Sequence, residues 1–259
     1  MAEMLFDQAG TRFYHTGVSK LALFVMAMTG DSVPSAPSTV TAITGYSTWK
    51  SLYKAGVAWN GATNVTNSPS GGDETELWAD NIKYGSLRAA EKSGGTIEAY
   101  QFPQEFWPCN GAVIVNGVVV GQQERRKFAV AYLSNVGNDQ TTSAGEVLHL
   151  VWNASTNPSE HSSETINDSP DAGTFSFEYS ADSVAWTDSN YNTMKAVSTM
   201  EIDTTTITNG KNNANYIALC NMVYGKNESA ASAGDGIDPQ MPSPDVVLAL
   251  MGRALPAAG

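Results

Sequence analysis

Lysine and arginine are scarce in this sequence of 259 residues. The sequence contains 14 lysines and arginines and 26 aspartates and glutamates, which gives a formal net charge of -12. Residues 128–194 contain no lysine or arginine at all, although many acids lie there. Because nucleic acids and anionic membranes are bound through positive charge, this balance argues against affinity for either.

Cysteine and histidine are also rare, and their spacing matches neither a redox motif nor a metal-binding motif. Cys109 and Cys220 form no C-x-x-C pair, and the three histidines are not spaced as metal ligands. We therefore expect free, packed thiols in a reducing compartment, with a single disulfide as the open alternative. His149 lies in a strand-like segment and is interpreted as structural, and His161 is interpreted as solvated.

Catalytic and membrane signatures are missing too. The motifs G-x-S-x-G, G-x-G-x-x-G and G-x-x-x-x-G-K do not occur, so we expect no catalytic residue, cofactor or metal. The apolar run at residues 21–28 is far too short to span a bilayer. Residues 1–15 lack the basic start and apolar core of a signal peptide, so we expect no membrane partner and synthesis in a cytosol.

Serine, threonine, asparagine and glycine are abundant between short apolar segments, a composition that favours strands and turns. The pair Asn116–Gly117 predicts a type I′ hairpin within residues 113–120. Apolar alternation and β-branched content predict the other strands. These are residues 18–28, 77–84, 96–102, 128–133, 147–152, 175–179, 201–207 and 214–224.

Helices and loops are expected in fewer places. One helical turn is predicted at residues 103–107, and a short helix at residues 244–251 behind a cap at Ser243. Residues 30–72 are expected to form a long loop with one or two short strands. Residues 227–241 are small and polar enough to form a mobile loop.

Several motifs occur in an order that resembles the major tail protein family of long-tailed, siphovirus-type bacteriophages. In chain order they are LWADN (77–81), GTIEAY (95–100), PQEF (103–106), GQQERRKF (121–128), VGND (136–139), NPSE (157–160), TINDSP (165–170) and PSPDVVLAL (242–250). Asp171 stands where the family has a glutamate. The similarity runs from about Leu77 to Asp171 and more loosely to Met251, whereas the region before Gly72 matches poorly and resembles an insertion.

The resemblance implies a tail tube protein and an all-β fold with minor α. The expected architecture is a β-sandwich or partly open barrel with one or two short helices, a long loop and terminal arms. A single domain would span residues 1–259, with the insertion at about 30–72 and the mobile loop at about 227–241.

The resemblance also implies an assembly. Such subunits form hexameric rings that stack into a tube, and genomic DNA passes through it without specific binding. The implied partners are further copies of the chain and tape-measure, terminator and baseplate proteins. The implied location is the virion tail, assembled in the host cytoplasm, and no active site comes with the family.

Two groups of charged residues are candidate contacts in such an assembly. A bore wall that repels phosphate would let DNA slide, so acids from the segment without cations are candidates for the bore or for contacts between subunits. They are Asp139, Glu146, Glu160, Glu164, Asp168 and Asp171. Arg125, Arg126 and Lys127 form the one basic cluster, either a solvated strand edge or a patch that faces a neighbour's acids.

Two other functions remain open from the sequence. A secreted carbohydrate-binding β-sandwich would present exposed aromatic side chains, for which the candidates are Trp49, Tyr53, Trp59 and Trp186. Secretion, which that function requires, has no signal in the sequence. The other alternative is a different virion protein of the same fold, a baseplate or decoration protein.

Overall fold

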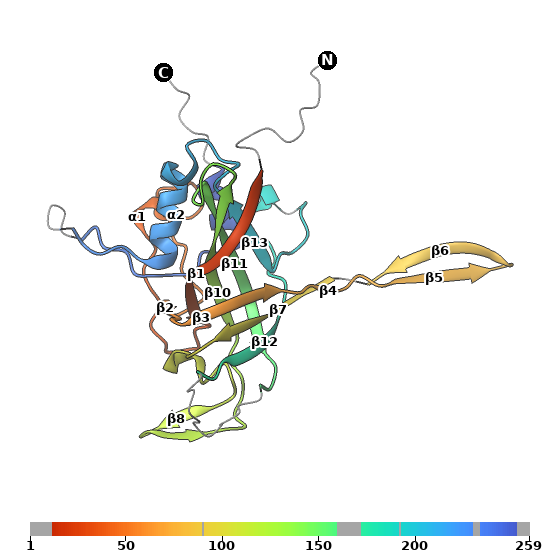
Figure 1. Ribbon diagram of the computed structural model, residues 1–259, viewed down its shortest axis with the longest axis horizontal. Helices are drawn as coiled ribbons and strands as arrows, with labels where there is room; N and C mark the ends of the chain where they lie inside the picture. The colour runs from red at the N-terminus through yellow and green to blue at the C-terminus, as the bar shows by residue number, and fades with distance from the viewer. Residues whose placement is uncertain (1–11, 90, 160–171, 192, 230–233, 253–259) are drawn as a thin grey trace, which may run out of the picture.

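The computed structural model describes residues 12–89, 91–159, 172–191, 193–229 and 234–252, and antiparallel strands make up most of its regular structure (Figure 1). This confirms the expected all-β fold with minor α. The strands are β1 (Phe13–Val25), β2 (Val57–Ala58), β3 (Ala62–Asn67), β4 (Ser70–Gly71), β5 (Glu74–Ala79), β6 (Ile82–Arg88), β7 (Glu91–Ala99), β8 (Val113–Val115), β9 (Val118–Val120), β10 (Phe128–Asn138), β11 (Gly145–Thr156), β12 (Phe175–Ala181) and β13 (Thr199–Asp203). The predicted terminal arms fall largely in residues 1–11 and 253–259, outside the described residues.

One large sheet organises the chain, with the strand order β2-β1-β10-β11-β12-β7-β3. The central strand β11 changes neighbours along its length: its first part pairs with β13, and its last part pairs with β12. Asn153 marks the change with a positive φ of 50°. The sheet therefore bends into two halves that face each other and does not close between β1 and β3.

The end of β1, within the strand predicted at residues 18–28, is buried on both faces. Leu21, Leu23 and Val25 point into the core between the two sheet halves, and Ala22 and Phe24 point toward the helices. Because strand side chains alternate, only a continuous apolar run can satisfy two cores at once. The strands predicted at residues 128–133 and 147–152 are also confirmed, and they pair with each other as β10 and β11.

The core between the sheet halves is rich in aromatic side chains. Trp59 is 2% exposed and its ring centroid lies 4.5 Å from that of Phe106 and 5.8 Å from that of Phe177. The indole N–H of Trp59 donates to Gln101 O at 2.8 Å, so its polar atom is satisfied inside the core. Phe106 belongs to the 3₁₀ turn η1 (Gln104–Phe106), which confirms the predicted helical turn.

The prediction of a strand at residues 214–224 is wrong, because this segment is the helix α2 (Ala214–Tyr224). The side chain of Asn213 caps it by accepting from the N–H groups of Asn215 and Tyr216. Tyr216, Leu219 and Val223 recur at helical spacing and cover the outer face of the sheet. The apolar content suited either structure, and the cap decides between them.

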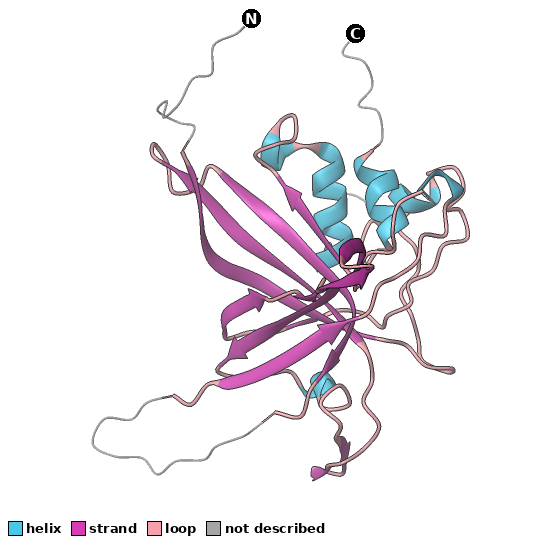
Figure 2. Cartoon of the chain, turned by 90° about the vertical axis from the view of Figure 1, so that its right-hand side faces the viewer, coloured by secondary structure: helices cyan, strands magenta, loops and turns pink. Residues whose placement is uncertain are grey.

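The predicted C-terminal helix is confirmed as α3 (Pro244–Met251), with Pro244 in its first turn. Ser243 occupies the cap position but makes no capping bond; its hydroxyl accepts from Trp49 Nε1 at 3.2 Å. Figure 2 shows α2 and α3 together on one side of the sheet. No helix in the described part of the chain is long and apolar enough to cross a membrane.

Residues 30–72 are more regular than the expected long loop. They contain α1 (Ser38–Thr41), β2, β3 and β4, and β3 joins the main sheet by pairing with β7. Tyr46, Tyr53 and Trp59 anchor the segment in the cores. Of the predicted mobile loop at 227–241, residues 230–233 lie outside the described residues, and Lys226 and Ile237 form a β-bridge.

Two further predictions about strands have clear outcomes. The Asn116–Gly117 hairpin is confirmed, with Val115 paired to Val118 and positive φ at both turn residues. The strand expected at 201–207 ends at Asp203, because the Asp203 carboxylate accepts from the N–H and hydroxyl of Thr205 and turns the chain. The remaining short elements are the 3₁₀ turns η2 (Ser189–Tyr191) and η3 (Gly210–Asn212).

Candidate functional site

A hairpin of β5 and β6, here called the arm, projects from the body of the protein (Figure 1). It continues the ribbon of β3 and β7, with β4 paired to β7 between them. At its base the Ala89 N–H donates to Asp73 O at 3.0 Å, and at its tip Asp80 and Asn81 have φ of 47° and 63°. Six strand residues at about 3.3 Å each give the arm a reach of about 20 Å.

The arm corrects the prediction of one strand at residues 77–84. The chain reverses inside that segment, because Asp80 and Asn81 both tolerate the positive φ of a type I′ turn. The long apolar-rich pattern concealed a turn that has the same chemistry as the one correctly predicted at Asn116–Gly117. Asp-Asn was the available signal.

The two faces of the arm differ in chemistry. Cross-strand pairing places Glu74 opposite Arg88 and Glu76 opposite Ser86, and Lys83 Nζ lies 2.7 Å from Glu76 Oε1. Hydrogen bonds from Ser86, Arg88 and Lys83 lower the pKa of Glu74. The other face is apolar. Alternation assigns to it Leu77, Ala79, Ile82 and Leu87.

Nothing in the described part of the chain covers this apolar face. Leu77 is 41% exposed, Ile82 64% and Leu87 60%. Within the described residues each arm strand pairs only with the other, so both outer edges are open. Because an isolated two-stranded hairpin is marginal in water and exposed apolar surface marks interaction sites, the arm is a candidate contact surface.

A second surface is the outer face of β3, β7 and β12. Their inward side chains, such as Ile97 and Phe177, fill the core, while Glu98 and Glu178 point outward. These glutamates are diagonal neighbours, since Glu98 pairs with Ser176 and Glu178 with Thr96. The helices α2 and α3 cover the other half of the sheet, and no described helix covers this half, so its outer face is open within the described residues and its charge is negative.

The structure separates the candidate acids. Asp139 is exposed after the end of β10. Glu146 points toward the helices, where Oε1 accepts from Tyr216 Oη at 2.8 Å and Oε2 lies 3.8 Å from Lys211 Nζ. These partners fasten α2 to the sheet, and a role of Glu146 in a bore or between subunits stays a prediction. The other four acids, Glu160, Glu164, Asp168 and Asp171, lie outside the described residues.

The basic cluster is engaged within the chain. Arg125 donates to Thr156 O at 3.1 Å, Arg126 lies 3.1 Å from Asp31 Oδ2, and Lys127 Nζ lies 2.6 Å from Asp182 Oδ2. The pKa of Asp31 is lowered, mainly by the hydrogen bond from the Met28 N–H. The nearby positive charges of Lys54 and Arg126 lower it further. Each of the three cations therefore has an acceptor within the chain. The inter-subunit role of the cluster stays a prediction.

A hydrogen-bonded chain of three side chains was not anticipated from the sequence. Ser134 Oγ lies 2.8 Å from His149 Nε2, and His149 Nδ1 lies 3.1 Å from Glu201 Oε1. The Tyr132 ring stacks on the imidazole at 4.4 Å. Burial lowers the pKa of His149 against the opposing effect of Glu201, so the neutral ring bridges hydroxyl and carboxylate. Ser134 and His149 are 15 residues apart in the sequence, and His149 and Glu201 are 52 apart, so no local motif indicates the arrangement.

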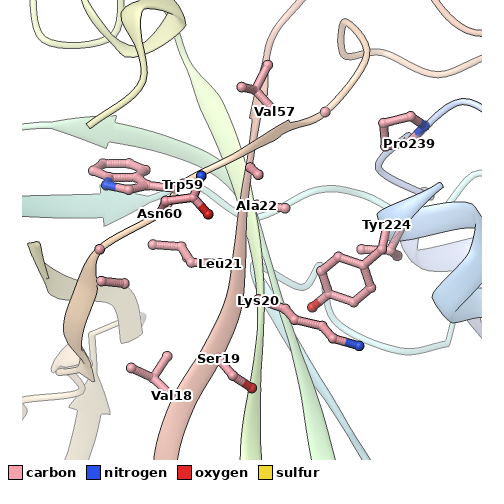
Figure 3. Close-up of a pocket in the computed structure, with 15 residues that line it drawn as sticks. Val18, Ser19, Lys20, Leu21, Ala22, Val57, Trp59, Asn60, Tyr224 and Pro239 are labelled. Atoms are coloured by element: carbon pink, nitrogen blue, oxygen red, sulfur yellow. The ribbon is translucent and has the colours of Figure 1, made fainter. Parts of the chain in front are cut away.

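The cavity beside β1 offers less chemistry. It measures about 560 Å³ and opens where β1 and β3 diverge (Figure 3). Lys20, with a φ of 51°, places Nζ 5.8 Å from the centroid of the Tyr224 ring. Its lining contains neither an acid nor a histidine, so it supplies no carboxylate or imidazole base.

The aromatic side chains proposed for carbohydrate binding do not form a platform. Tyr53 and Trp59 are 3% and 2% exposed, and Trp49 and Trp186 are half-buried. The indole N–H of Trp186 donates to Lys195 O at 2.8 Å. Sugar stacking needs exposed rings, so these four side chains do not support a lectin-like function.

Both thiols are free, as predicted. Burial raises the pKa of Cys109 to about 12 and that of Cys220 to about 11, so neither is a reactive thiolate at neutral pH.

No known protein family matches the chain, and no curated protein sequence matches it either. The resemblance to tail proteins therefore rests on the sequence motifs.

Proposed function

We propose that the protein is a structural subunit of a bacteriophage tail tube, assembling with copies of itself into stacked rings. The observation that carries the proposal is the arm: about 20 Å of hairpin with one apolar face that no described residue of the chain covers. Its open edges add backbone hydrogen bonds to that contact, as in strand addition. This role needs no catalysis, no cofactor and no membrane.

The uncovered face of β3, β7 and β12 supports the second half of the proposal, a channel for DNA. In β3, β12 and residues 93–99 of β7, the only charged side chains are Glu98 and Glu178. Asn64 Nδ2 and Asn157 Nδ2 donate to these carboxylates at 3.3 Å and 3.1 Å, which fixes them on the surface. A wall of this composition repels phosphate and lets a duplex slide.

Concentrated, purified full-length protein is expected to form long hollow tubes of uniform width. Copies that each offer the same arm and accept a neighbour's arm join by a repeating contact, which closes into rings or extends into a filament. Negative-stain electron microscopy checks this directly, and light scattering after size exclusion gives the mass of any smaller ring.

Two outcomes would overturn the proposal. One is a chain that stays monomeric at high protein concentration, where a subunit with an uncovered arm should associate. The other is a monomer that binds members of a glycan array. Closed dimers or caps without tubes would instead favour a baseplate or decoration protein of the same fold.

A second candidate function, acyl transfer, is favoured by the Ser134, His149 and Glu201 arrangement. A neutral histidine that accepts from serine and donates to a carboxylate is the relay that activates a nucleophile. If the relay works, a fluorophosphonate probe forms an adduct on Ser134, detected by intact mass. The rate rises with pH through the lowered pKa of His149, because only the neutral ring accepts the proton.

In that case Ser134→Ala abolishes the adduct and His149→Gln slows it by about a hundredfold or more, while the matched control Ser176→Ala changes nothing. The assembly proposal expects no adduct on wild-type protein. Labelling therefore separates the two functions without any need to know a substrate.

A further inference from the structure

We propose that the hairpin of β8 and β9, here called the valine hairpin, is the axial contact of the assembly and seats in a groove beside α2 of a second copy. This inference rests on the proposed function and assigns to it a surface distinct from the arm. It begins from the composition of the hairpin: residues 111–123 contain no charged side chain, and five valines and one isoleucine occupy its strands.

The valine hairpin is exposed on both faces. Val113, Val115, Val118 and Val120 share one face by cross-strand pairing, and Ile114 and Val119 share the other. All six side chains are between 37% and 62% exposed. A solvated hairpin of this kind normally carries polar side chains on one face at least, so both faces are built for contact with apolar surface.

Its base is held rigidly. The Gln123 N–H donates to Gly111 O at 2.9 Å and the Arg126 N–H donates to Pro108 O at 2.9 Å. Below them Thr156 Oγ1 donates to Cys109 O at 2.6 Å. A fixed base presents the aliphatic side chains without the entropy cost of ordering a loose loop, which favours tight association.

The same chain offers a seat toward its opposite end. Figures 1 and 2 both place the valine hairpin at one end of the molecule and α2 toward the other. A groove of about 560 Å³ runs between α1 and α2, with Pro37, Ile217 and Ala218 in its lining. Ile217 is 44% exposed, and at one side of the groove Lys226 and Asp235 neutralise each other at 2.7 Å.

The lining combines the apolar side chains of Ile217 and Ala218 with polar groups. Asp238 adds a carboxylate beside the Lys226–Asp235 pair, so the seat disfavours an anionic occupant. A hairpin without charge meets that requirement, whereas a nucleic acid or an acidic peptide does not. Because hairpin and groove lie at different ends of one chain, the contact is heterologous, and in a stacked tube it repeats along the tube axis. It stacks subunits, while the arm joins them in another direction.

Cross-linking tests the assignment in the full-length chain with Cys220→Ala as background. The double variant Val119→Cys with Ile217→Cys is expected to give a covalent ladder on oxidation at assembling concentration. An equimolar mixture of the two single variants should stop at dimers that contain one of each. If Val119→Cys alone gives dimers, the hairpins pair with each other, and the proposed seat is wrong.

Microscopy of the same samples separates this inference from the proposed function. Tubes without a ladder would overturn the seat and leave the tube role standing, whereas a ladder without tubes would support the seat and overturn the tube role. If neither forms, both fail. As a second variant, Val119→Asp should shorten tubes at least tenfold, to single rings or short stacks, and the matched control Gln122→Asp should leave their length unchanged. Full-length tubes from Val119→Asp would overturn the contact.

Discussion

A chain that lacks residues 74–88 is expected to stay folded and to lose tube formation at the concentrations at which the wild-type protein assembles. The arm contributes no buried side chain to the body, and Asp73 and Ala89 already meet at its base through a 3.0 Å hydrogen bond. A short Gly-Ser turn between them closes the chain without strain. We expect the unfolding free energy to change by less than about 0.5 kcal/mol, the usual range for surface changes.

Assembly should suffer far more than stability. The arm presents three large aliphatic side chains, and burial of each contributes about 1.5 kcal/mol or more. Loss of about 4 kcal/mol per contact raises the concentration needed for assembly by about a thousandfold. Sedimentation velocity across a concentration series measures this shift, and thermal unfolding of the same samples measures stability.

A matched pair of substitutions tests whether the apolar face is responsible. Leu87→Lys and Ser86→Lys add the same charge at adjacent positions, but the two side chains point to opposite faces of the arm. Leu87→Lys should abolish assembly, and Ser86→Lys should leave it nearly intact. If both variants assemble equally well, the apolar face of the arm is not an interface.

The sequence predicts the sheet well where one rule decides the outcome. In β12, Phe177 and Tyr179 face the core while Ser176 and Glu178 face outward, so alternation alone indicated the strand and its inner face. At Asn116–Gly117 the turn chemistry was equally decisive. In β1 the residues from Leu21 to Val25 are all apolar, and this uninterrupted part is the part buried on both faces.

Prediction failed where two patterns compete or where contacts are distant. The segment of α2 has enough β-branched and aromatic residues for a strand, and only the cap at Asn213 reveals the helix. The Asp80–Asn81 turn was hidden within an apolar segment. The Ser134, His149 and Glu201 arrangement joins three strands. Glu98 lies outside residues 128–194, the segment without lysine or arginine that supplied the candidate acids. Both sites depend on the register between strands that are distant in the sequence. The sequence does not specify that register.

Reversal of charge on the uncovered sheet face is expected to turn a tube that releases DNA into one that holds it. In the double variant Glu98→Lys with Glu178→Lys, each subunit replaces two outward carboxylates with ammonium groups on diagonal positions. Neither glutamate belongs to the arm or to the valine hairpin, so tubes should still form. Co-sedimentation of assembled tubes with short duplex DNA is the measurement.

Wild-type tubes should retain no DNA at 50 mM salt, because a surface with a net charge of -12 per chain repels phosphate. The variant should retain it at 50 mM salt and lose about a thousandfold in affinity by 200 mM, the dependence expected when about six or more phosphates are neutralised. Glu105→Lys with Glu124→Lys is the control, since it changes net charge equally at exposed positions away from this face. If the control retains as much DNA, net charge alone governs binding, and the face formed by β3, β7 and β12 is not the bore.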